Sequence, residues 1–134
     1  MYMLDTDICI FILRRSIPKL MTRIQAVPLP EQVMSVVTLA ELLYGVQESA
    51  PAKRKGNRAA VDALVRHVGV LDWTDKAAEH YAEIRADLKR KGKLIGANDL
   101  MIAAHARSER ATVVTNNTKD YGRVKGLKVE NWTT

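Results

Sequence analysis

The chain has 134 residues, 47% of them hydrophobic, which is enough for one buried core and too little for two ordinary domains. We therefore expect a single domain over residues 1–134. The only cysteine, Cys9, excludes an internal disulfide and a cysteine-based zinc site. Asp5 and Asp7 interrupt the first apolar residues, and no apolar run approaches the roughly 20 residues of a membrane span. We expect no membrane segment and a cytoplasmic location. The 21 Lys and Arg against 15 Asp and Glu give a net charge of +6, which favours a polyanionic partner.

Short β-branched runs alternate with longer helical patterns along the chain. The pattern predicts strands at 2–4, 32–37, 68–71, 112–115 and 127–131, and helices at 7–14, from Ser16 or Pro18 to 25, from 38 onward, at 53–67, from Thr74 to 92, at 99–108 and briefly near 119. Thr38 and Glu41 form a capping-box pattern, and Asn98 is the expected N-cap of the helix over 99–108. Strands regularly separated by helices predict an α/β fold, a three-layer α/β/α sandwich around a mostly parallel sheet of about five strands.

Several acidic residues lie next to the predicted strand ends. In an open parallel sheet, ligands bind at the carboxyl ends of the strands, because each crossover leaves its first loop there. Asp5 follows the first strand, Glu41 lies in the helix after the second, and Asp120 follows the strand at 112–115. Asp99 precedes that strand, so it reaches the same edge only if the start of its helix projects there. We predict an acidic cluster at this edge.

Each acid also has a purely structural explanation. A negative charge such as Asp7 is favourable in a first helical turn, and Glu41 completes a capping box. Arg85 is either a surface residue or a phosphate contact. The residues expected to support the site or contact substrate are Thr38, Arg85, Asn98, Thr115, Asn116 and Asn117. Only the joint placement of the acids favours a functional site.

A cluster of carboxylates needs compensation, because two of them about 4 Å apart repel by about 4 kcal/mol at an effective dielectric near 20. Either protons supply it, which raises one or more pKa values, or a divalent cation does. All-oxygen ligands favour Mg²⁺ as the cation, with Mn²⁺ as the alternative. His67, His80 and His105 lie away from the acid-bearing loops and are expected to be structural or exposed. A carboxylate-held metal on a basic protein is suited to cleaving a phosphodiester.

Five blocks of the sequence closely resemble the VapC toxins, which are ribonucleases of the PIN-domain superfamily. The blocks occur in order over essentially the whole chain, and they are Met3-Leu4-Asp5-Thr6-Asp7-Ile8-Cys9, Ser35-Val36-Val37-Thr38-Leu39-Ala40-Glu41-Leu42, Ile95-Gly96-Ala97-Asn98-Asp99-Leu100-Met101-Ile102-Ala103-Ala104-His105-Ala106, Val114-Thr115-Asn116-Asn117 and Glu130-Asn131-Trp132. The resemblance implies a single PIN domain with Mg²⁺ held mainly by Asp5 and Asp99, while Glu41 completes the catalytic set. The fourth acidic position falls after Thr115, where the chain offers a carboxylate only at Asp120.

The resemblance also implies a biological role. It indicates a toxic endoribonuclease of a type II toxin–antitoxin system that cleaves structured RNA such as tRNA and is neutralised by a VapB-type antitoxin. Toxins of this class commonly form homodimers and larger assemblies with the antitoxin, and they contact operator DNA only through it. Ile10, Phe11 and Leu20 are the candidate docking surface for the antitoxin.

Two alternatives remain open at this point. Asp5-Thr6-Asp7 looks like the opening of haloacid-dehalogenase-type phosphatases, in which Asp5 would be the nucleophile and Asp7 the general acid. A non-catalytic module that binds nucleic acid through its basic face is the second, with the acids merely capping helices. It predicts that neutral replacement of Asp5 or Asp99 leaves every activity intact.

Overall fold

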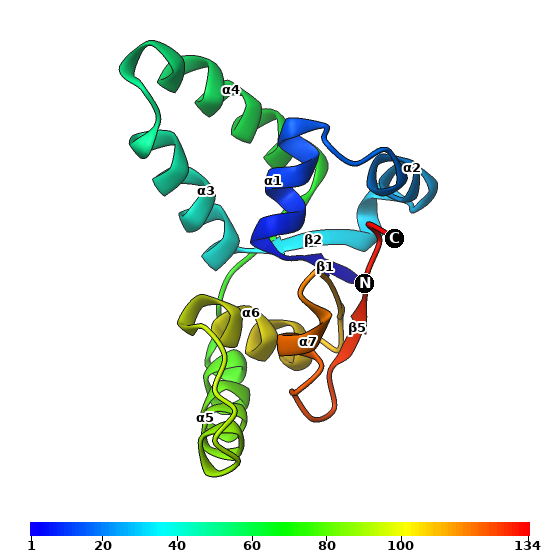
Figure 1. Cartoon of the computed structure of the whole chain (residues 1–134), viewed down its shortest axis with the longest axis vertical. Helices are drawn as coiled ribbons and strands as arrows, with labels where there is room; N and C mark the ends of the chain where they lie inside the picture. Colours follow the sequence, from blue (N-terminus) through cyan, green and yellow to red (C-terminus); the bar gives the residue numbers. More distant parts are fainter.

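A parallel sheet of five short strands forms the centre of the protein (Figure 1). The computed structural model describes residues 1–134. The strands are β1 (Tyr2–Leu4), β2 (Gln32–Ser35), β3 (Gly69–Leu71), β4 (Thr112–Val114) and β5 (Lys128–Glu130). They lie in the order β3-β2-β1-β4-β5, and every neighbouring pair is parallel. The predicted parallel sheet is confirmed.

Helices cover both faces of this sheet. They are α1 (Thr6–Arg14), α2 (Pro18–Ala26), α3 (Val36–Glu48), α4 (Pro51–His67), α5 (Asp75–Arg90), α6 (Ala97–Ser108) and α7 (Thr118–Tyr121), with a short 3₁₀ turn, η1, at Leu29–Glu31. Helices α1 to α4 lie on one side of the strands and α5 to α7 on the other (Figure 1). Because alternate strand residues point to opposite faces, Met3 belongs to the core under α5 and α6, whereas its neighbour Leu4 belongs to the core under α1 to α4. The predicted three-layer sandwich is confirmed.

Two helices begin earlier than their cap patterns predict. Helix α3 starts at Val36, where the Ser35 hydroxyl accepts the backbone N–H of Val37 at 3.1 Å, so Thr38 lies inside the helix and the Thr38–Glu41 capping box is wrong. Helix α6 starts at Ala97 after Gly96, so Asn98 is an exposed second helical residue and not the N-cap. The N-cap of α3 is Ser35, the last residue of β2, and the N-cap of α6 is Gly96 in the preceding loop. The position of that strand or loop in the fold therefore sets where each helix begins.

Cys9 and His105 are both buried inside the fold. Cys9 is buried in the core under α1. His105 is buried on α6, where its Nδ1 lies 2.8 Å from the Ser35 hydroxyl oxygen, and burial lowers the pKa of its imidazole. His105 therefore joins α6 to the residue that caps α3. None of the helices has the length and apolar composition needed to cross a bilayer.

Candidate active site

Three segments meet at the carboxyl edge of the sheet, where β1, β2 and β4 end. Strands β1 and β4 pair in register up to Leu4 and Val114, so Asp5 and Thr115 leave the sheet side by side. On the other flank of β1, Ser35 ends β2 and leads directly into α3. The topology thus brings the start of α1, the start of α3 and the segment after β4 to one place.

Asp5 is the most deeply buried acid of this edge, with 3% of its surface exposed. It is the N-cap of α1, where its Oδ1 accepts the backbone N–H of Ile8 at 2.9 Å, and its carboxylate also accepts a hydrogen bond from the Thr115 side chain. Burial raises the pKa of Asp5 to about 7, against the lowering effect of these hydrogen bonds, and the charges of Asp7 and Asp99 add to the rise. The site therefore contains a carboxylate whose negative charge is poorly compensated by the protein itself.

Asp99 reaches the same edge from the first turn of α6. It is half-buried, and its Oδ1 accepts a hydrogen bond from the Tyr121 hydroxyl at 3.2 Å. Burial raises the pKa of Asp99, and the nearby charges of Glu41, Asp7 and Asp120 raise it further. From the sequence, Asp99 could reach this edge only if the start of its helix projected there. In the structure the start of α6 does project to the edge.

Glu41 joins the site from the second turn of α3. Its Oε1 accepts a hydrogen bond from the Thr6 hydroxyl at 2.6 Å, and the Thr6 oxygen lies 3.3 Å from the hydroxyl oxygen of Thr38. The buried Thr38 thus supports Thr6, which in turn holds Glu41. Thr6 was not among the residues predicted from sequence. No local pattern could have found it, because its partner lies 35 residues away along the chain.

Asp120 lies at the rim, on the short helix α7. Both of its carboxylate oxygens already have partners: Oδ2 accepts the Asn117 side-chain amide at 3.1 Å, and Oδ1 lies 3.6 Å from Arg123. Asn117 caps α7 and donates its backbone N–H to the Thr115 hydroxyl at 2.9 Å, whereas the side chain of Asn116 is exposed. Asp120 contributes charge near Asp99, and the segment after Thr115 is ordered around it by hydrogen bonds.

Arg85 and Leu20 do not belong to this cluster. The exposed Arg85 guanidinium lies over the ring of Tyr81, 5.9 Å from its centroid, and donates to the Tyr81 hydroxyl at 2.9 Å. Leu20 is completely buried in the core, so its prediction as docking surface is wrong. Helix α2 packs the Leu20 side chain inward, in the same core cluster as Leu4 and Met34 of the sheet.

The donor set of the edge consists of carboxylate oxygens and suits a hard cation. No three Asp, Glu, His or Cys side chains converge closely enough to surround one ion on their own. Mg²⁺ keeps several of its waters and binds through one or two carboxylates together with substrate phosphates, so it does not require such a cage. Residues Asp5 and Asp99 therefore fit Mg²⁺ as a partly hydrated ion, and they fit zinc poorly.

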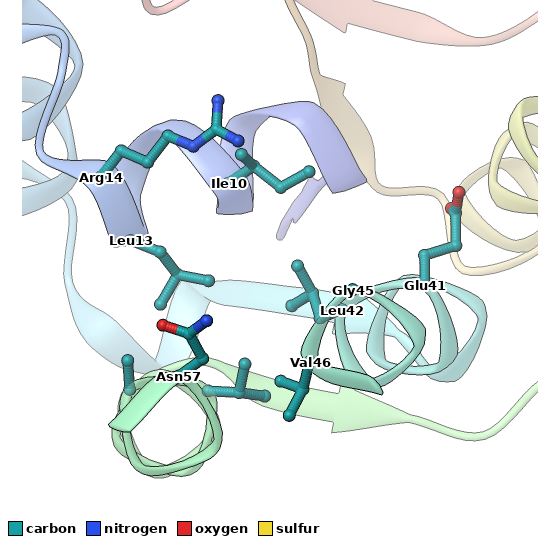
Figure 2. Close-up of a pocket in the computed structure, with 10 residues that line it drawn as sticks. Ile10, Leu13, Arg14, Glu41, Leu42, Gly45, Val46 and Asn57 are labelled. Atoms are coloured by element: carbon teal, nitrogen blue, oxygen red, sulfur yellow. The ribbon is translucent and has the colours of Figure 1, made fainter. Parts of the chain in front are cut away.

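An apolar groove of about 280 Å³ opens beside Glu41, between α1, α3 and α4 (Figure 2). It is lined by Ile10, Leu13, Arg14, Glu41, Leu42, Gly45, Val46, Asn57, Ala60 and Val61. Of the predicted docking residues, Ile10 lines the groove, and Phe11 is partly buried on the same helix without lining it. Helix α1 thus contributes Ile10, Leu13 and Arg14 to the wall of an open groove.

The PIN domain family model matches residues 2–127 of the chain. A curated ribonuclease VapC2 of Haemophilus influenzae is 40% identical over 131 residues, which cover 98% of this chain and 97% of the relative. A tRNA(fMet)-specific endonuclease VapC of Shigella flexneri is 41% identical with the same coverage. The solved structure of VapBC2 from Rickettsia felis bound to a promoter DNA fragment matches with a TM-score of 0.91 at 36% identity, covering 98% of each chain.

The chain therefore belongs to the PIN-domain family and, within it, to the VapC ribonucleases. This membership confirms the predicted fold and the predicted enzyme class. It also excludes the phosphatase and the non-catalytic binding module as descriptions of the protein. Asp7, the proposed general acid of the phosphatase alternative, is an exposed residue in the first turn of α1.

Proposed function

We propose that the protein is a toxic endoribonuclease that requires Mg²⁺, with Mn²⁺ as a substitute, and hydrolyses phosphodiester bonds of structured RNA. Asp5 and Asp99 are the metal ligands, and Glu41 completes the catalytic set. The observation that carries the proposal is the meeting of these three acids, from three different elements, at the carboxyl edge of the sheet. Asp120 contributes negative charge from the rim.

The bound ion would stabilise charge on the scissile phosphate and lower the pKa of a coordinated water. The protein's own residues prepare the site for it. Asp5 and Asp99 both carry raised pKa values, because burial and the charges of neighbouring acids disfavour their ionised forms, and a cation would relieve both effects. Glu41, held at one oxygen by Thr6, would accept a proton or orient water at the site.

The charge distribution supports RNA as the substrate. The net charge of +6 favours a polyanionic substrate, because Lys and Arg side chains can contact the phosphate backbone. We propose tRNA as the target class, since a relative 41% identical is a tRNA(fMet)-specific endonuclease. We also propose a cytoplasmic location, because tRNA is found there.

The groove beside Glu41 is the proposed docking site of a VapB-type antitoxin. Apolar side chains such as Ile10, Leu42 and Val46 would receive an apolar segment, and Glu41 at the end of the groove would receive a basic side chain of the antitoxin. Solved VapBC complexes are the structural relatives that suggest this partner. We further propose that residues 1–134 act as one PIN domain, that the toxin forms homodimers and larger assemblies with its antitoxin, and that operator DNA is contacted only through the antitoxin.

The decisive experiment measures cleavage of a tRNA pool by the purified chain with Mg²⁺, with Mn²⁺ and in excess EDTA. We expect discrete cleavage products with either metal, none in EDTA, and none with Asp5→Asn or Asp99→Asn. Asp62→Asn is the matched control, because Asp62 forms an exposed ion pair with Arg58 on α4 and such pairs contribute little. Undiminished cleavage in EDTA, or by both site variants, would overturn the metal-dependent mechanism.

A further inference from the structure

Each of the three acids at the edge accepts a hydrogen bond from a hydroxyl group that lies on another element. The Thr115 hydroxyl, just after β4, donates to Asp5, just after β1. The Thr6 hydroxyl on α1 donates to Glu41 on α3. The Tyr121 hydroxyl on α7 donates to Asp99 on α6. These donors are supplied by residues that the acidic pattern itself does not include.

Tyr121 is the most informative of the three donors. Its side chain is completely buried in the core shared with α6, and its hydroxyl donates to Asp99 Oδ1 at 3.2 Å. A buried tyrosine hydroxyl needs a partner, and here that partner is a proposed metal ligand. The second oxygen, Asp99 Oδ2, accepts no hydrogen bond from the protein and lies near Gly96, the residue before α6.

We propose that Tyr121 is a positioning residue that orients the Asp99 carboxylate, fixing Oδ1 and leaving Oδ2 for the cation. The inference rests on the proposed function of Asp99 as a metal ligand. Hydrogen bonds to ligand side chains typically affect metal affinity or activity by about 10- to 100-fold when they are removed. A single hydroxyl bond to one oxygen of one ligand belongs to the lower end of that range.

Tyr121→Phe tests the proposal, because it removes the hydroxyl and keeps the ring that fills the core. Mn²⁺ binding to the purified chain without RNA is measured by titration calorimetry and by the electron paramagnetic resonance signal of the free ion. We expect about tenfold weaker Mn²⁺ binding than in the wild type, and a lower kcat for RNA with an unchanged KM. Tyr44→Phe is the control, since Tyr44 is 66% exposed on α3, and it should bind Mn²⁺ like the wild type.

A double-mutant comparison separates positioning from a general effect on the fold. In the Asp99→Asn background, Tyr121→Phe should cause no further loss of Mn²⁺ affinity, because the group that it orients no longer acts as a ligand. Wild-type Mn²⁺ affinity in Tyr121→Phe would overturn the positioning role while leaving the proposed function standing. A wild-type chain that cleaves RNA without binding Mn²⁺ or Mg²⁺ would overturn the proposed function and the positioning role together.

Discussion

Neutralising Asp5 should make the metal-free protein more stable while it abolishes catalysis. In Asp5→Asn the amide oxygen can still accept the Ile8 backbone N–H, so the N-cap of α1 survives. The variant lacks the Asp5 carboxylate, whose charged form is disfavoured by burial. Wild-type and variant therefore differ mainly in the cost of ionising residue 5 inside the fold.

The size of this cost follows from the pKa of Asp5, which rises from 3.8 in the unfolded chain to about 7 in the fold. Below the unfolded value both states are protonated and no cost arises. As the pH rises from about 4 to 7, the unfolded chain loses the proton first, so the wild-type fold loses stability relative to the variant. One pKa unit corresponds to about 1.4 kcal/mol, so the difference reaches about 4 kcal/mol above pH 7.

Urea unfolding in excess EDTA, followed by circular dichroism at several pH values, measures this difference directly. At pH 8 we expect Asp5→Asn to unfold at a clearly higher urea concentration than the wild type. At pH 5 its free energy of unfolding should exceed that of the wild type by about 1–2 kcal/mol, and near pH 4 the two should be similar. Adding Mg²⁺ should stabilise the wild type and leave the variant nearly unchanged. A gap of the same size at every pH, or a less stable variant at pH 8, would refute the reasoning about Asp5.

Three other predictions concern residues around the site. Thr6→Val should lower kcat for RNA by about tenfold because Glu41 loses its hydroxyl donor, and Thr6→Ser should restore the rate; equal rates in both variants would contradict this. Gly45→Gln should block the groove and let the toxin escape its antitoxin in a co-expression growth assay. Gly56→Gln on α4 is its control, since a Cβ at either glycine meets nothing within 4 Å; neutralisation of both variants would argue against this groove. Ser35→Ala should destabilise the fold by about 1–2 kcal/mol in urea unfolding, because α3 loses its cap and His105 its partner.

Much of the architecture could be predicted because it depends on local patterns. Short β-branched runs and helical periodicity gave the five strands and the order of helices, and a regular alternation of the two leaves a parallel sheet as the simplest arrangement. The predicted starts of α3 and α6 were wrong, because Thr38 and Asn98 are favourable cap residues that do not act as caps in the folded protein. Cap preferences are worth only about 1 kcal/mol, so packing of the preceding strand or loop overrides them.

Which acids could form the site follows from the order of elements along the chain, because Asp5 and Glu41 follow strands whose carboxyl ends must share an edge. Three features depend instead on packing: the first turn of α6 brings Asp99 to that edge, Thr6 and Tyr121 supply hydroxyl donors, and Leu20 is buried. The two hydrogen bonds join residues 35 and 22 positions apart, so their geometry depends on how whole helices pack against the sheet. The sequence therefore predicts the acidic cluster, whereas the hydroxyl groups that orient its carboxylates are brought into place by packing.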